Sequence, residues 1–335
     1  MRFGLEGEAG VSPAALLPGL ATALLIAGAA SFVADTYGGP VMLLALLIGI
    51  AFNFLSEGEK VGPGIRFTSK TVLKLGVALL GLRIAMSDVL ALGGTTVVIL
   101  LVVMTVTILS GLLFARLFGR SAAFGTLIGG ATAICGASAA LALSSALPNS
   151  ASKDRETIFA VVSVTTLSTI AMVVYPVIAR LLGFDDRVTG ILLGATIHDV
   201  AQVVGAGYAV SLEAGDTATV IKLFRVAMLV PIVFFVSLAF SGQPGMGTSR
   251  LPVPLFAVGF AALVVLNSMG VVPDTVKGPL IEISRWCLIA AVAAIGLTTS
   301  IPEMLKIGRS AIAVSVATSL VLLLAVIILL WEFGG

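Results

Sequence analysis

Long apolar runs separated by short polar links constrain the fold of this chain more than any other feature of its sequence. In hydrocarbon every backbone polar group needs a partner within the protein, so only helices and closed barrels cross a membrane. Apolar residues make up 59% of the 335 residues and charged residues only 11%, which excludes an ordinary soluble domain. Because many runs reach the roughly 20 residues that a spanning helix needs, the sequence predicts an all-α polytopic membrane protein.

About eleven hydrophobic segments are predicted, and links rich in proline, glycine and charge separate them. None of the links is long enough to form a soluble domain, so we predict a single transmembrane transporter domain over residues 1–335. The predicted segments are 14–34, 40–56, 69–87, 94–115, 122–147, 157–182, 188–211, 218–240, 252–271, 281–300 and 309–331.

The distribution of lysine and arginine predicts the orientation of the chain. If every segment crosses, eleven of the 19 basic residues lie in links on one side and only Lys153, Arg155 and Lys277 lie in links on the other. Links rich in Lys and Arg face the cytoplasm. We therefore expect a multi-pass protein of the prokaryotic plasma membrane, with its N-terminus in the cytoplasm and its C-terminus outside.

The segment at 190–209 carries ionisable groups inside an apolar run. It holds the single histidine, His198, beside Asp199, with Gln202 one turn after the histidine at i,i+4 spacing on a shared helical face. A charged side chain at the centre of a membrane helix costs at least ~2.5–3.5 kcal/mol, and such residues usually face a cavity or a partner. The pair is predicted to couple transport to an ion, because a histidine titrates near neutral pH. The alternative is a structural contact in which the carboxylate orients the imidazole.

A second glycine-rich segment, at 129–143, echoes the first. Aligning residues 130–132 with 194–196 also places Ser138 opposite Gln202. Two glycine-broken hydrophobic segments in matching positions indicate a transporter binding site, whereas small residues also serve tight helix packing in membranes. We predict that both segments are broken or re-entrant, that they approach each other near mid-membrane, and that they bind substrate through Thr132, Cys135, Gly136, Ser138, Thr196 and Gln202.

Two basic residues, Lys222 and Arg225, lie at i,i+3 spacing near the start of the eighth segment. Long basic side chains at helix ends often extend back to the interface, but both could instead point inward, hold an anion or neutralise Asp199. We predict the inward orientation and a substrate-binding role, with Arg225 as the better oxyanion partner because its guanidinium group is bidentate. Lys74 and Arg83 are weaker candidates of the same kind.

The chain also contains a short internal match between residues 81–94 and 296–309. It pairs the third segment with the tenth, which cross in opposite directions, and it predicts an inverted repeat of segments near 40–115 and 252–331. A match this short in a Gly- and Leu-rich composition also arises by chance. The segments at 122–147 and 188–211 fit an inverted pair only if both are re-entrant, and charge counting does not decide between spanning and re-entry.

The sequence lacks the motifs of other function classes. One histidine with two distant cysteines, Cys135 and Cys287, makes no metal-ligand set. No P-loop, nucleophile elbow or HExxH motif is present, so we expect neither ATP-driven transport nor an enzyme. The expected partners are the lipid bilayer, a small inorganic or organic anion, H⁺ or Na⁺ as coupling ion and, in a homodimer, a second copy of the chain, but no nucleic acid.

The sequences ATAICGASA at 131–139 and ATIHDVAQVVGAG at 195–207, followed by KLFR at 222–225, resemble the YeiH-type family of bacterial membrane proteins, described as sulfate exporters. The resemblance covers nearly the whole chain. It implies kinship with the superfamily of cation/proton antiporters and bile-acid/sodium symporters, whose fold has inverted repeats and crossed, unwound helices. Some relatives carry Asn and Glu where this chain has Ala137 and Asp199; the carboxylate is kept and the amide is not.

We therefore expect a secondary active transporter that exports a small anion, such as sulfate or a related sulfur oxyanion, coupled to H⁺ or Na⁺ through His198 and Asp199. A cation/proton antiporter, in which Asp199 exchanges the ions directly, is the alternative within transport. A membrane scaffold or sensor without transport is the alternative from another class.

Overall fold

The computed structural model describes residues 12–37, 41–91, 93–148, 150, 152–240, 255–298 and 309–333, and every regular element in these ranges is a helix. Six of the helices are long and apolar enough to cross a membrane. They are α1 (Pro13–Tyr37), α6 (Gly93–Leu117), α9 (Lys153–Leu181), α12 with α13 (Leu212–Ala227 and Leu229–Ala239), α15 (Asp274–Thr298) and α17 (Arg309–Phe333). The multi-pass helical class is confirmed, while the count of about eleven segments stays a prediction.

The remaining helices are shorter, and several of them join end to end into longer irregular segments. Their bounds are α2 (Val41–Ala51), η1 (Asn53–Glu57), α3 (Gly62–Phe67), η2 (Thr68–Val72), α4 (Leu73–Leu80), α5 (Met86–Ala91), α7 (Ala122–Ala133), α8 (Ala137–Ala146), α10 (Asp186–Thr196), α11 (Val200–Val210) and α14 (Leu255–Ser268). The stretch η2 is a π-helical turn that joins α3 to α4.

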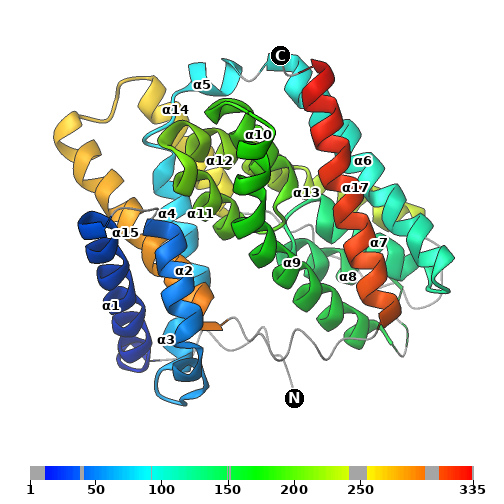
Figure 1. Ribbon diagram of the computed structural model, residues 1–335, viewed down its shortest axis with the longest axis horizontal. Helices are drawn as coiled ribbons and strands as arrows, with labels where there is room; N and C mark the ends of the chain where they lie inside the picture. The colour runs from blue at the N-terminus through cyan, green and yellow to red at the C-terminus, as the bar shows by residue number, and fades with distance from the viewer. Residues whose placement is uncertain are drawn as a thin grey trace.

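The helices pack as two groups that lie side by side (Figure 1). The side bundle consists of α1 to α4 with α14 and α15, and the hairpin bundle consists of α6 to α13 with α17. Helix α11 contacts α2 and α15 across the boundary between the two bundles. The side bundle therefore joins an early and a late part of the chain, and the candidate site residues of the two glycine-rich segments all lie in the hairpin bundle.

Within the side bundle, the early and late helices make matched contacts. A Cβ atom added to Gly81, just after α4, would lie 2.4 Å from the carbonyl oxygen of Phe260 on α14, so only a glycine allows this approach. On the other pair of helices, a Cβ atom added to Gly296 of α15 would lie 2.4 Å from the carbonyl oxygen of Leu46 on α2. The contact between α4 and α14 thus has a counterpart between α15 and α2.

Two asparagines on these helices make a similar matched pair of contacts. Asn53 Nδ2, after α2, donates to the carbonyl oxygen of Leu297 at 2.7 Å, and Asn267 Nδ2 on α14 donates to the carbonyl oxygen of Ile84 at 3.1 Å. Each amide thereby binds a backbone carbonyl near the end of the neighbouring helix. Most of the second half of the matched sequence pair, residues 299–308, lies outside the described residues.

Candidate functional site

Helices α7 and α8 form a hairpin whose turn comprises residues 134–136. A Cβ atom added to Gly130, before the turn, would lie 2.3 Å from Cδ1 of Leu143, well after the turn, so the chain doubles back on itself. Gly136 makes the reversal possible with φ of 64° and ψ of −122°, a conformation that side chains with a Cβ rarely adopt. The first glycine-rich segment is therefore broken into a helical hairpin.

Helices α10 and α11 form a second hairpin, whose turn comprises residues 197–199. Cβ atoms added to Gly190 on α10 and to Gly207 on α11 would lie 2.8 Å and 3.1 Å from the same atom, the carbonyl oxygen of Ala214 on α12. The start of α10 and the end of α11 therefore lie at one level, next to the start of α12. This segment is also a broken helical hairpin, the geometry that re-entry requires, while its placement in the membrane stays a prediction.

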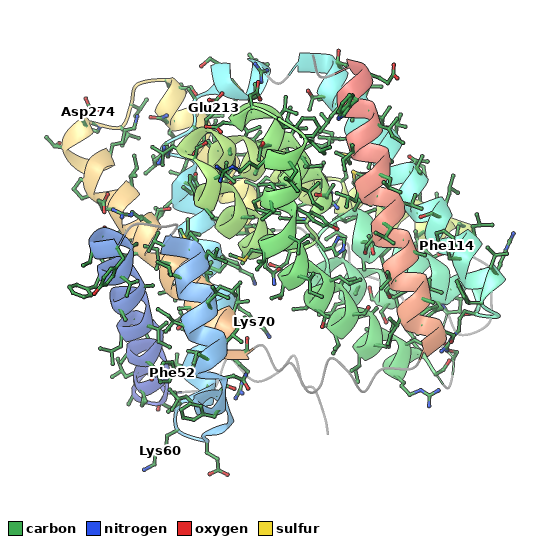
Figure 2. The ribbon with its side chains drawn as sticks, viewed as in Figure 1. Phe52, Lys60, Lys70, Phe114, Glu213 and Asp274 are labelled. Carbon is green, nitrogen blue, oxygen red and sulfur yellow. The ribbon has the colours of Figure 1, made fainter. Side chains whose placement is uncertain are left out.

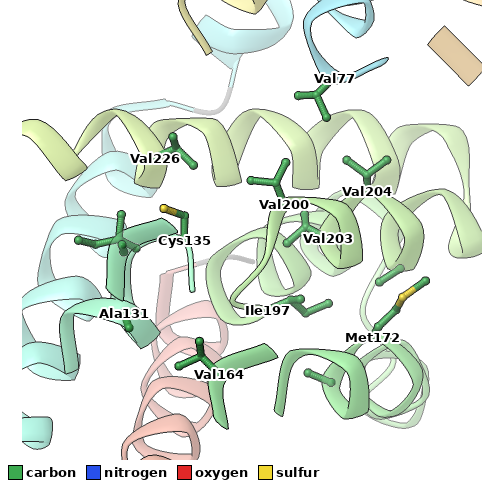
Figure 3. Packing of buried hydrophobic residues seen from close by; sticks show 14 of the residues in the cluster. Val77, Ala131, Cys135, Val164, Met172, Ile197, Val200, Val203, Val204 and Val226 are labelled. Carbon is green, nitrogen blue, oxygen red and sulfur yellow. The ribbon is translucent and has the colours of Figure 1, made fainter. Parts of the chain in front are cut away.

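The two hairpins enter the hairpin bundle from opposite ends, and their turns meet in its middle. Helix α9 has 29 residues and is therefore about 43 Å long. The open end of the first hairpin lies beside the start of α9, where Ser144 Oγ and Thr157 Oγ1 are 2.7 Å apart. The turn of the second hairpin lies beside the middle of α9, where the backbone N–H of Asp199 donates to Ser168 Oγ at 3.0 Å. Figure 3 shows Cys135 at the first turn and Ile197 and Val200 at the second, packed beside Val226 of α12.

Lys222 is fully buried and joins the two turns. Its ammonium group donates to the carbonyl oxygen of Ile134 at 2.6 Å and to that of Ile197 at 3.0 Å. These carbonyls belong to the C-terminal ends of α7 and α10, which lack helical partners and carry a partial negative charge. One ammonium group thus satisfies an unpaired carbonyl in each hairpin.

Arg225 acts on the same helix ends and is 1% exposed. Its Nε donates to the carbonyl oxygen of Ala133 at 2.8 Å, and its Nη2 donates to that of Thr132 at 2.8 Å. Its Nη1 donates to the carbonyl oxygens of Gly194 at 2.9 Å and Ile197 at 3.2 Å. Neither side chain extends to the membrane–water interface, because both charged groups donate hydrogen bonds to backbone carbonyls inside the hairpin bundle.

A cavity of about 560 Å³ lies between the two bundles, beside the meeting point of the turns. Lys70 and Lys74 of the side bundle and Asp199 of the hairpin bundle are the charged residues among the described ones that line it. Cys135, Ser138 and Gln202 of the predicted substrate-binding set also line it, and Gly136 lies at the turn beside it. The remaining predicted residues do not contribute to its wall: Thr132, Thr196, His198, Lys222 and Arg225.

Lys74 is one of the weaker candidates predicted from the sequence, and Lys70 is not among the predicted site residues. Both lysines lie on one face of η2 and α4 at i,i+4 spacing within the predicted segment 69–87. Two lysines on one face of an apolar segment were the signal for this part of the site. Figure 2 shows Lys70 between the bundles, displaced from Glu213 toward the end of the molecule that carries Lys60.

The side chains of His198 and Asp199 point to different places. His198 Nε2 lies 3.0 Å from Ser319 Oγ of α17, and Nδ1 is buried without a hydrogen-bond partner among the described residues. Asp199 lines the cavity and caps α11, because its Oδ1 accepts from the backbone N–H of Ala201 at 2.9 Å. The prediction that His198 and Gln202 share a helical face is wrong, because the helix is interrupted at 197–199.

Gln202 is held by two side chains of α9. Its Oε1 accepts from Ser168 Oγ at 2.9 Å, and its Nε2 donates to Thr169 Oγ1 at 3.1 Å. Thr196 Oγ1 donates to its own helix, to the carbonyl oxygen of Leu192 at 2.6 Å, whereas Thr132 Oγ1 is buried with no hydrogen-bond partner within the described ranges. Gln202 is therefore the amide that links the second turn to α9 at the edge of the cavity.

A polar cluster joins the two bundles away from the cavity. Arg83 Nε, after α4, lies 3.0 Å from Asp216 Oδ2 on α12, and Tyr208 OH on α11 donates to Asp216 Oδ1 at 2.5 Å. The guanidinium carbon of Arg83 also lies 5.7 Å from the centre of the Tyr208 ring. Asp216 follows Glu213, which Figure 2 places at the end of the molecule opposite Lys60. We call these three residues the latch.

The chain is similar to known membrane proteins over nearly its whole length. The family described as Conserved hypothetical protein 698 matches residues 18–315. The UPF0324 membrane protein CT0845 of Chlorobaculum tepidum is 46% identical over 98% of this chain and 93% of its own length. The UPF0324 membrane protein TauZ of Paracoccus denitrificans is 47% identical over 96% of both chains. No solved structure matches the chain.

Proposed function

Because this chain belongs to the UPF0324 family of membrane proteins, we propose that it is a secondary active transporter that exports a small anion. The observation that carries the proposal is a cavity between the two bundles, beside the two hairpin turns that meet inside the hairpin bundle. Sites at the meeting point of broken helices are typical of secondary transporters. Sulfate, the substrate expected from the sequence resemblance, is one member of this class.

The charges around the turns favour an anion. The C-terminal ends of α7 and α10 carry about half a negative charge each, and the N-terminal ends of α8 and α11 about half a positive charge each. The four helix ends therefore cancel, and Lys222 and Arg225 add two positive charges against the one carboxylate of Asp199. Lys70 and Lys74 raise the excess further at the cavity wall. A cavity of one sign of charge concentrates ligands of the opposite sign.

Movement of one bundle against the other would give alternating access. We take the Lys60 end as the open end, because the cavity wall includes Lys70, which Figure 2 shows on that side, whereas the latch joins the bundles near Glu213. We assign the open end to the cytoplasm, because it holds most of the Lys and Arg residues in the links. The matched contacts of α2 with α15 and of α14 with α4 support an inverted repeat as the basis of this exchange.

A cation/proton antiporter is the second candidate, and the position of Asp199 favours it. This carboxylate is half-buried, lines the cavity and caps α11. An intramembrane carboxylate facing a cavity is a candidate ion carrier. In the anion transporter the same carboxylate would bind the coupling H⁺ or Na⁺. The two candidates therefore differ in whether Lys70 and Lys74 bind an anion.

Transport by the purified protein in proteoliposomes tests the proposal. Sulfate, sulfite and a panel of small organic anions would be applied in turn, with and without a pH or Na⁺ gradient, and protein-free liposomes would be the control. Anion flux that responds to one of the two gradients is expected. A response to Na⁺ or Li⁺ with no anion flux would replace the proposal by the antiporter, and no flux of either kind would favour a scaffold or sensor.

A further inference from the structure

The wall of the cavity is mostly apolar. The side bundle contributes Leu73, Val77 and Phe256, and the hairpin bundle contributes Val161 and Val226 among others. The polar groups are the two lysines, one carboxylate, one amide, one thiol and six hydroxyl groups. Apolar surface does not favour a strongly hydrated inorganic ion, because removing water from such an ion without replacing its hydrogen bonds is costly.

The size of the cavity points the same way. Its volume of about 560 Å³ falls in the range of roughly 300–1,000 Å³ found for sites that bind organic molecules. A single tetrahedral oxyanion would occupy only a part of it. An anion that also has an apolar body would fill the remainder and exclude water from the aliphatic wall.

The positive groups available to such a ligand are Lys70 and Lys74. Lys222 and Arg225 are buried and donate to carbonyl oxygens of the two turns, so the ligand has no access to them. Lys70 and Lys74 are exposed, line the cavity and share one helical face. A lysine ammonium group acts as a point charge with three donors and accepts a sulfonate or carboxylate in many orientations.

We propose that the cavity binds an amphipathic organic monoanion, with its acid group at Lys70 and Lys74 and its apolar body against the wall that includes Phe256. The inference rests on the proposed function, because it names the substrate class of the same cavity. It distinguishes an alkanesulfonate or carboxylate from bare sulfate.

Binding to the full-length protein in detergent, measured by calorimetry, tests the inference with a series of n-alkanesulfonates from ethane to hexane. The dissociation constant should fall roughly three- to fourfold for each methylene group until the cavity is filled. Sulfate should bind more weakly than the longer sulfonates. A sulfate affinity above that of every sulfonate, with no dependence on chain length, would overturn the inference.

Variants separate the acid-binding group from the apolar wall. Lys74→Gln should weaken binding of every sulfonate about tenfold or more, because a hydrogen-bonded charge is lost. Lys60→Gln, in the exposed link before α3, is the matched control and should change nothing. Phe256→Ala should flatten the dependence on chain length and leave the sulfate affinity unchanged. Lys70→Gln replaces Lys74→Gln if the latter does not fold.

Two controls keep the outcomes distinct. Alkyltrimethylammonium ions of the same chain lengths should not bind, and equal affinity for them would reduce the sulfonate result to detergent-like adsorption and overturn the inference. The binding assay needs no transport, so chain-length-dependent binding without flux in proteoliposomes would refute the transporter and keep the site. Sulfate flux without chain-length dependence would keep the transporter and refute this inference.

Discussion

Two pairs of basic residues lie near the meeting point of the hairpins, and they differ in what their donors contact. Lys222 and Arg225 are buried at 0% and 1% exposure and donate to backbone carbonyls of both turns. Lys70 and Lys74 are exposed, and no ion pair of theirs occurs among the described residues. The buried pair completes the fold of the hairpins, and the cavity pair is left available for a ligand.

The difference shows why charge alone does not identify a ligand site. A buried cation without a partner costs several kcal/mol, so Lys222 and Arg225 are compatible with the interior only because the helix ends of α7 and α10 accept from them. A cation at a water-filled cavity carries no such requirement. The same side-chain type therefore serves structure at one position and binding at another, and substitutions should separate the two.

The largest effect is expected from Arg225→Gln. The side-chain amide of glutamine cannot make the hydrogen bonds that the Arg225 guanidinium group donates to the carbonyl oxygens of Ala133, Thr132 and Gly194. Each lost charged hydrogen bond is worth about 1.5–3 kcal/mol, so we expect a loss of at least about 3 kcal/mol in stability. The melting temperature in detergent measures it, with wild type as control. A variant that melts like wild type and only loses ligand affinity would make Arg225 a ligand instead.

The next effect concerns coupling. Asp199→Asn keeps an acceptor oxygen for the backbone N–H of Ala201, so the protein should fold. We expect anion flux in proteoliposomes to stop responding to the pH or Na⁺ gradient. His198→Gln is the matched comparison, because His198 contacts Ser319 away from the cavity. Gradient-driven flux at the wild-type rate in Asp199→Asn would exclude this residue as the coupling group.

A smaller effect, on the population of the two conformations, is expected at the latch, where Arg83 is partly exposed and pairs with Asp216. The side chains of Arg83 and Asp216 are 27% and 30% exposed, so their ion pair is worth at most about 1 kcal/mol. Breaking it with Arg83→Asp should shift the population of the two conformations up to about fivefold toward opening at the latch end. The exchanged pair, Arg83→Asp with Asp216→Arg, should restore the wild-type value.

Labelling measures the latch effect. Ser138→Cys faces the cavity in a protein without its native Cys135 and Cys287. A membrane-impermeant maleimide applied from the latch end should label it faster when the ion pair is broken. Equal labelling rates in all variants would show that the latch does not control access.

The sequence predicted the local features of the molecule well. The glycine and polar pattern at 129–143 and 190–209 is contained within each segment, so the broken hairpins could be read from it. The contacts that define the roles are long-range. Lys222 donates to a carbonyl 88 residues earlier in the chain, and His198 contacts a serine 121 residues later. No local pattern shows these partners.

Lys70 was missed, and Lys74 was named only as a weaker candidate, for a related reason. A lysine in an apolar segment reaches either the interface or a cavity, and the packing of α4 against the hairpin bundle decides which. The periodicity of 69–87 does not contain that information. The structure places Lys70 and Lys74 on the wall of the cavity.

One substitution made at two positions tests the comparison most directly. Lys222→Gln and Lys74→Gln change the same side chain in the same way, and melting temperature and alkanesulfonate affinity would be measured for both. We predict that Lys222→Gln lowers the melting temperature strongly, whereas Lys74→Gln melts like wild type and binds about tenfold more weakly. A stable Lys222→Gln protein that has lost affinity, beside a Lys74→Gln protein that binds normally, would contradict the account.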